Sequence, residues 1–151
     1  SNFVRINVLN NTMFTDQGII EGKSHEINQF KSTLNNVVEI YADVFVKHAV
    51  PAPGSKIENH AAELIERAGA DVVIVTGDGT GHEINMDDLE KVRNIVPEGK
   101  LAIGSGVNAA NVGAYQDIAD ILIIGTSFKF DNIVSKKVDI NRVEEIVSKV
   151  K

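Results

Sequence analysis

An aspartate and a lysine, Asp43 and Lys47, lie in the apolar segment 38–48, which ends at His48. In a β-strand alternate side chains point to opposite faces, so Asp43, Phe45 and Lys47 share one face. The other face is purely apolar, as in strands covered by helices, and carries Ile40, Ala42, Val44 and Val46. A buried charge needs a counter-charge or a water-filled cavity. The pair is therefore either a structural ion pair in a barrel interior or part of a catalytic site, with Asp43 as base or metal ligand. Lys47 would stabilise an oxyanion or act as a nucleophile, and His48 would serve as acid or base if the strand bends.

A second pair of polar residues lies in the first apolar segment, 3–9. Its side chains alternate between an apolar face and a face that carries Arg5 and Asn7. Functional groups gather where parallel strands end at the same edge of an α/β sheet. We therefore expect Asn7 and Arg5 to lie beside Asp43 in a single polar site, with Asn7 among the catalytic residues.

The segment 11–22 that follows is long for a connection between a strand and a helix. Long ordered loops on the catalytic face often carry functional residues. Asp16, together with Glu21 and His25, would then reach the pocket. Alternatively, these three side chains belong to an ordinary surface loop and to the outside of the next helix.

Two short glycine-containing loops follow the last two predicted strands. Glycines let backbone N–H groups approach an anion, and a following helix adds the positive end of its dipole. Hydroxyl groups and the charge of Lys129 would add further donors. Alternatively, the glycines serve ordinary tight turns. The phosphate-binding reading assigns six residues: Gly104, Ser105, Gly106, Gly125, Thr126 and Ser127.

The glycine-rich segment 76–82 lacks the Lys-Ser/Thr of a Walker loop, so it is either a mobile rim of the site or a simple connection. His60 and His82 are expected to face solvent. The spacing of acidic and histidine residues predicts no dedicated metal site. A Mg²⁺ ion held through a substrate phosphate is compatible with the sequence, because such sites need only one or two protein carboxylates.

Apolar, β-branched segments alternate with segments that have helical patterning. Strands are predicted at 3–9, 38–46, 71–76, 100–104 and 120–125. Helices are predicted at 24–34, 55–69, 85–97, 108–118 and 141–150, with a capping box from Ser55 to Glu58 and caps at Asn85 and Asn108. Such alternation indicates parallel βα units.

Five βα units fit either a small doubly wound sheet or five-eighths of a (β/α)₈ barrel. Polar residues on the inner face and glycines at strand ends favour the TIM barrel, which typically takes about 250 residues. We therefore expect a single domain over residues 1–151 that holds the last five βα units of an incomplete barrel, with the first three units absent.

The 151 residues are 43% hydrophobic and 24% charged, which is typical of a globular domain. The net charge of −6 gives no electrostatic reason to bind nucleic acid. Without cysteine, the chain has no disulfide or thiolate chemistry. No apolar segment reaches the roughly 18 residues of a membrane span, so we expect a soluble, cytoplasmic protein.

Several of these motifs occur together in the order and spacing of the BtpA family, which the chain resembles over its whole length. They are 7–9, 15–18 with 21–22, 42–44, 46–49, 75–77 with 80–81, 104–107 and 125–127 with Lys129. The resemblance implies a TIM barrel of the ribulose-phosphate-binding type. It matches the C-terminal three-fifths of a typical member, so the chain is interpreted as a fragment of a longer protein. Open sheet edges would favour a homo-oligomer.

The residues and the resemblance together suggest an enzyme-like barrel that binds a phosphorylated small molecule, a sugar phosphate or a nucleotide. The family resemblance implies phosphoribosyl or other phosphosugar chemistry. The alternative, also implied by the resemblance, is a non-catalytic assembly or stability factor for membrane complexes such as photosystem I. The sequence carries no anchor or large exposed apolar helix that favours this alternative.

Overall fold

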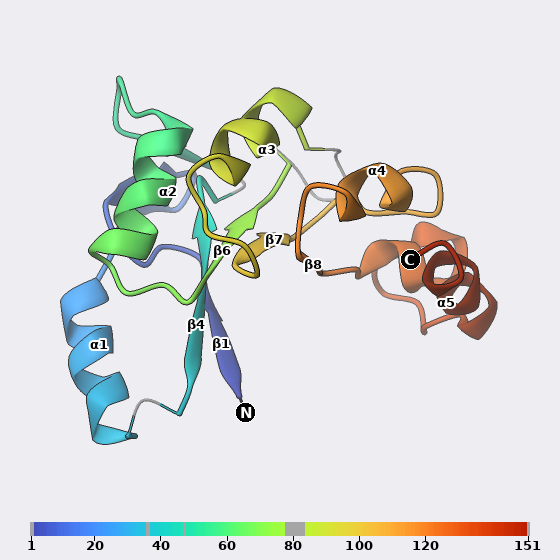
Figure 1. Cartoon of the computed structure of the whole chain (residues 1–151), viewed down its shortest axis with the longest axis horizontal. Helices are drawn as coiled ribbons and strands as arrows, with labels where there is room; N and C mark the ends of the chain where they lie inside the picture. The colour runs from blue at the N-terminus through green and yellow to red at the C-terminus, as the bar shows by residue number, and fades with distance from the viewer. Residues whose placement is uncertain (1, 36, 47, 78–83, 151) are drawn as a thin grey trace.

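Five parallel strands form the main sheet of the computed structural model, which describes residues 2–35, 37–46, 48–77 and 84–150. Their order in the sheet is their order in the chain, β1-β4-β6-β7-β8 (Figure 1). A doubly wound sheet would reverse this order, so the structure confirms the barrel-type arrangement. The strands are β1 (Phe3–Ile6), β4 (Glu39–Val44), β6 (Val72–Val75), β7 (Leu101–Ile103) and β8 (Ile121–Leu122).

Helices cover one face of this sheet. They are α1 (Ser24–Thr33), α2 (Ile57–Glu66), α3 (Met86–Arg93), α4 (Val112–Gln116) and α5 (Ile140–Val147). Ile40, Ala42 and Val44 of β4 are buried in the same apolar cluster as Ala61 and Leu64 of α2. This confirms the predicted helix-facing side of β4.

The opposite face of the sheet carries a smaller apolar cluster and some polar side chains. Val72, Ile74 and Ala102 form a small buried cluster there, against which Tyr41 and Ile123 pack. The Tyr41 ring also stacks on Phe3 of β1, with the ring centroids 4.4 Å apart. Because side chains alternate along a strand, Arg5 and Asp43 share this face with Phe3 and Tyr41.

Two aspartates fasten the beginnings of strands, at the end of the sheet opposite the glycine loops. Asp71 Oδ2 accepts hydrogen bonds from the Ile40 N–H at 2.8 Å and from Lys31 at 2.6 Å. Asp120 Oδ2 likewise accepts from the Leu101 N–H at 2.9 Å and from Arg93 at 2.8 Å. Burial pushes the pKa of Asp120 upward, but these hydrogen bonds outweigh it and lower the pKa below its ordinary value. Each carboxylate thus joins two strand–helix units.

The helix starts agree with the predicted caps only in part. The Asn85 side chain accepts from the N–H groups of Asp87 and Asp88, as predicted. The Ser55–Glu58 capping box is wrong, because α2 begins after Lys56 and the Ser55 hydroxyl donates to the Ala52 carbonyl instead. Asn108 bonds the N–H of Ala110 in a turn before α4, which starts only at Val112.

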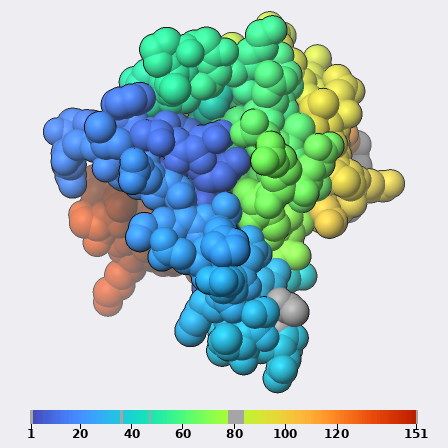
Figure 2. Space-filling view, turned by 90° about the vertical axis from the view of Figure 1, so that its left-hand side faces the viewer, coloured from blue at the N-terminus to red at the C-terminus, as the bar shows by residue number. Residues whose placement is uncertain are grey.

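The long segment after β1 is a hairpin rather than a loop. Strands β2 (Thr12–Thr15) and β3 (Gly18–Glu21) pair antiparallel, and β5 (Ala49–Pro51) adds to β2 on its other side. Gly18 allows the tight turn because it adopts a φ of 122°, which strains other residues. Figure 2 shows the hairpin in blue beside α2 in green. The side-chain amide of Asn11 donates a hydrogen bond to the Glu63 carboxylate of α2.

None of the helices in the described part of the chain is both long enough and apolar enough to cross a membrane.

Val44→Ala should lower the free energy of unfolding by about 1–3 kcal/mol, because it leaves a cavity in the apolar layer between β4 and the helices. The same change at Val134, which is 62% exposed, should have little effect and serves as the control. Urea unfolding of the intact protein measures both. Equal losses for the two variants would contradict the assignment of the β4 faces.

Candidate functional site

The polar face of β1 and β4 is held by a bidentate ion pair between Arg5 and Asp43. Arg5 Nε lies 2.9 Å from Asp43 Oδ2, and Arg5 Nη2 lies 2.6 Å from Asp43 Oδ1. The Asp43 side chain is fully buried, whereas that of Arg5 is 31% exposed. The hydrogen bond to Asp43 raises the pKa of Arg5 although partial burial opposes this. Lys47, the predicted partner of Asp43, lies outside the described residues, and Arg5 supplies the counter-charge.

Gly104 lets the end of β7 approach this ion pair closely. A Cβ atom at position 104 would lie 2.5 Å from Ile74 Cγ2 and 3.0 Å from Arg5 Nη2. The guanidinium group therefore reaches from β1 across the concave face to the first glycine loop. Glycine is required here because there is no space for a side chain, whether or not the loop binds phosphate.

Hydrogen bonds within the protein connect the glycine loops. The Ser105 hydroxyl accepts from the Gly77 N–H at 2.9 Å, and the Ser127 hydroxyl donates to the Val107 carbonyl at 2.5 Å. The side-chain amide of Asn111 donates to the Gly106 carbonyl at 2.9 Å. Ser105 and Ser127 therefore shape the loops, while Thr126 lines the space between them.

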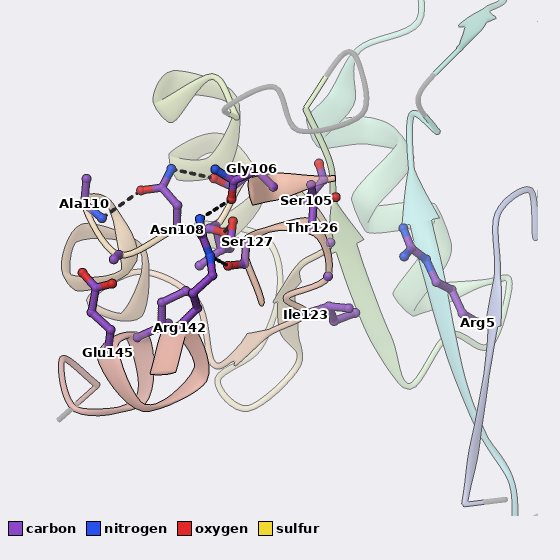
Figure 3. Close-up of a pocket in the computed structure, with 16 residues that line it drawn as sticks. Arg5, Ser105, Gly106, Asn108, Ala110, Ile123, Thr126, Ser127, Arg142 and Glu145 are labelled. Atoms are coloured by element: carbon purple, nitrogen blue, oxygen red, sulfur yellow. Dashed lines mark hydrogen bonds between the residues drawn. The ribbon is translucent and has the colours of Figure 1, made fainter. Parts of the chain in front are cut away.

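All six residues predicted to bind phosphate line one cavity of about 840 Å³ (Figure 3). Arg5 lines it from β1, and Arg142 and Glu145 line it from α5. The loops enter the cavity where β7 and β8 end, the edge of the sheet at which α/β barrels bind ligands. The cavity is large enough for a phosphate group with an organic body attached to it.

Arg142 is a residue of this cavity that the sequence did not reveal. Its Nε donates to the Ser127 carbonyl at 3.0 Å, and its Nη2 donates to Asn132 Oδ1 at 2.6 Å. Lys129, the cation expected at this position, instead forms an isolated β-bridge with Val138 and does not line the cavity. A single arginine on the exposed side of a predicted helix gave no signal for this role.

Three of the remaining predicted catalytic residues, Asn7, Asp16 and His48, do not line the cavity. Asn7 is exposed just beyond β1, and Asp16 is exposed in the turn between β2 and β3. His48 is exposed between β4 and β5, with a φ of 61°. Lys47 lies outside the described residues. Catalytic roles for these four residues stay predictions.

His60 was expected to face solvent, but it is buried on the side of α2 that meets the segment after β1. Its Nε2 lies 2.7 Å from Asn10 Oδ1, so Nε2 carries the proton and donates it. The Phe45 ring, expected on the concave face, packs on His60 with the centroids 5.3 Å apart, because a φ of 49° turns the chain at Phe45. Burial lowers the pKa of His60, and the nearby Glu63 opposes this shift.

No group of three or more histidine, aspartate and glutamate side chains is arranged to hold a metal ion in the described part of the chain. The Asp43 oxygens both accept from Arg5, which leaves Glu145 as the carboxylate that lines the cavity directly.

A parallel sheet in sequential strand order, with a cavity where β7 and β8 end, defines part of a TIM-type (β/α) barrel. Sequence comparison then gives the family: the chain belongs to the BtpA family, whose model matches residues 1–151.

Two relatives illustrate the range of the family. An uncharacterized protein of Methanocaldococcus jannaschii is 38% identical over 148 residues, which are 98% of this chain and 56% of the relative. The photosystem I biogenesis protein BtpA of Synechocystis is 37% identical over 145 residues, which are 96% of this chain and 50% of that protein. The chain thus spans about half the length of the curated relatives it matches.

Structural comparison supports the same fold. The crystal structure of 3-hexulose-6-phosphate synthase from Salmonella typhimurium superposes with a TM-score of 0.66 at 16% sequence identity. The match covers 99% of this chain and 62% of the synthase. At this identity the likeness concerns the fold alone, a sheet arrangement that matches part of a complete TIM barrel.

Gly104→Ala should destabilise the protein by about 1–3 kcal/mol, because the added methyl group collides with Ile74 and displaces the Arg5 guanidinium. Gly113→Ala is the control: the position is helical and its Cβ would meet no atom within 4 Å. That change should be neutral or stabilising. Thermal unfolding of the intact protein compares them, and equal behaviour of the two variants would contradict the close approach at Gly104.

His60 should make stability fall as the solution becomes acidic. Its folded-state pKa is lowered, so the unfolded chain takes up the proton first, and the stabilisation present above about pH 6.5 decreases below it. His60→Gln keeps a donor for Asn10 but does not titrate. Urea unfolding at about pH 7.5 and about pH 5 should show a larger acid-induced loss for the wild type than for the variant. A larger loss for the variant would contradict a buried, neutral His60.

Proposed function

We propose that the protein binds a phosphorylated small molecule, a sugar phosphate or a nucleotide, in the cavity between the two glycine loops. The observation that carries the proposal is the convergence of Gly104–Gly106, Gly125–Ser127 and Arg142 on one cavity of about 840 Å³. Backbone N–H groups at strand ends and an arginine are the donors that phosphate groups take in proteins.

Arg142 supplies the cationic charge at the phosphate end. Both of its described partners are uncharged oxygens, the Ser127 carbonyl and the Asn132 amide oxygen. These two bonds fix the guanidinium group beside the second glycine loop and leave its charge available to an anion. Thr126 lines the same space and adds a hydroxyl donor.

The reaction would be phosphoribosyl or other phosphosugar chemistry, in which Asp43 orients Arg5 rather than accepting a proton. Both Asp43 oxygens already accept hydrogen bonds from Arg5, and its side chain is fully buried. Lys47, His48, Asn7 and Asp16 are retained as catalytic candidates. A Mg²⁺ ion would bind through the substrate phosphate.

A role as a non-catalytic assembly factor is a second candidate, favoured by the 37% identity to the photosystem I biogenesis protein of Synechocystis. Such a factor would not require a phosphorylated metabolite. A thermal-shift screen of phosphorylated metabolites on the intact protein separates the two functions. Stabilisation by a sugar phosphate or nucleotide supports the first, and no stabilisation by any of them supports the second.

Arg142→Gln should weaken the binding of inorganic phosphate and of a pentose 5-phosphate by about tenfold or more, because it removes a charge-assisted hydrogen bond. Arg142→Lys should retain part of the affinity. Lys137→Gln makes the same change of net charge at an exposed position that does not line the cavity. Isothermal titration calorimetry measures all three variants. Equal affinities for Arg142→Gln and Lys137→Gln would refute the assigned site.

A further inference from the structure

The two arginines that line the cavity are in different electrostatic states. Arg5 is paired with a carboxylate, through Nε and Nη2, at 2.9 and 2.6 Å. Arg142 is held by two neutral oxygens. In Figure 3 the two side chains reach the cavity from opposite sides, with Ile123 between them. Glu145, the carboxylate that lines the cavity beside Arg142, is itself paired with Lys149 at 3.2 Å. The cavity therefore has one end where the cation is held by neutral oxygens and one end where the cation is already paired with a carboxylate.

Arg5 still has donors to offer the cavity. A guanidinium group carries five N–H donors in a fixed plane, and the contacts to Asp43 use one on Nε and one on Nη2. The others, on Nη1 and Nη2, belong to a side chain that is 31% exposed and lines the cavity. The ion pair also fixes the plane of these donors, because Asp43 itself is fully buried.

An ion pair with spare N–H groups suits an uncharged acceptor better than a second anion. A phosphate or carboxylate at Arg5 would lie close to the Asp43 carboxylate and be repelled by it. A hydroxyl or carbonyl oxygen accepts the same hydrogen bonds without that repulsion. The wall between the two ends includes Ile123, an apolar side chain that packs against the small buried cluster of Val72, Ile74 and Ala102.

We infer that the ligand is a phosphate monoester of a polyhydroxy or carbonyl compound, bound with its phosphate at Arg142 and its uncharged oxygens at Arg5. Arg5 is then a specificity-determining residue, and the site discriminates against bisphosphates. This inference rests on the proposed function, since it places the phosphate in the same loops. It adds the orientation of the ligand in the cavity and the chemical nature of the groups that bind at Arg5.

The test compares three probes by calorimetry: inorganic phosphate, a pentose 5-phosphate and a pentose bisphosphate. The wild type should bind the monophosphate more tightly than either of the others. Arg5→Lys keeps the charge but loses the planar fork, and should weaken the monophosphate about tenfold while inorganic phosphate changes less than about twofold. Arg142→Gln should weaken all three probes.

The outcomes separate the inference from the proposed function. If the bisphosphate binds the wild type most tightly, or Arg5→Lys weakens inorganic phosphate as much as the monophosphate, the inference is wrong but the phosphate site stands. If no probe binds the wild type, both are wrong.

Should Arg5→Lys fail to fold, the guanidinium NMR signals of Arg5 in the unmodified protein test the same point, whether Arg5 contacts the uncharged part of the ligand. They should shift with the pentose 5-phosphate and not with inorganic phosphate. Equal shifts with both probes would overturn the inference.

Discussion

The ion pair between Arg5 and Asp43 is the constraint on which the concave face depends. A buried carboxylate is tolerated only with a partner, and Arg5 meets both Asp43 oxygens from the neighbouring strand. A Cβ atom at position 104 would lie 2.5 Å from Ile74 Cγ2, 2.8 Å from Thr76 Cγ2 and 3.0 Å from Arg5 Nη2, so the end of β7 packs this closely only without a side chain there. The first glycine loop thus begins at a position that Ile74, Thr76 and the Arg5 guanidinium together restrict to glycine, and both Arg5 and Gly104 line the cavity.

The strand and helix order was predictable because each pattern is local. Alternation along β4 identified the helix-facing side of Ile40, Ala42 and Val44, and this side is buried as predicted. The hairpin was missed because its strands are short and two of their apolar residues, Phe14 and Ile19, stay exposed. Of its apolar residues Met13 is buried, but the turn at Gly18 and the pairing with β5 define the hairpin, and β5 lies more than 30 residues after β2 along the chain.

For the candidate site, too, local features were predictable from the sequence and long-range contacts were not. Glycines at strand ends were visible because a tight turn and a close approach are local demands on the chain. The directions of the Ser105 and Ser127 hydroxyls were not, because each is set by a carbonyl or an N–H on another loop. Arg142 depends on α5 packing against the second loop, and His60 depends on Asn10, which is 50 residues earlier in the chain.

The Arg142 end and the Arg5 end of the cavity depend on different parts of the protein. Among the residues that the structure describes, those between Gly104 and Ile146 supply most of the lining, and Arg5 alone comes from a distant strand. The relatives are about twice as long as this chain, so their further residues can add to the open edges at β1 and β8. Phosphate recognition is thus an attribute of this chain's own loops under the proposal. Under the same proposal, the reaction would depend on groups brought to the Arg5 end, where the neutralised ion pair would favour uncharged oxygens.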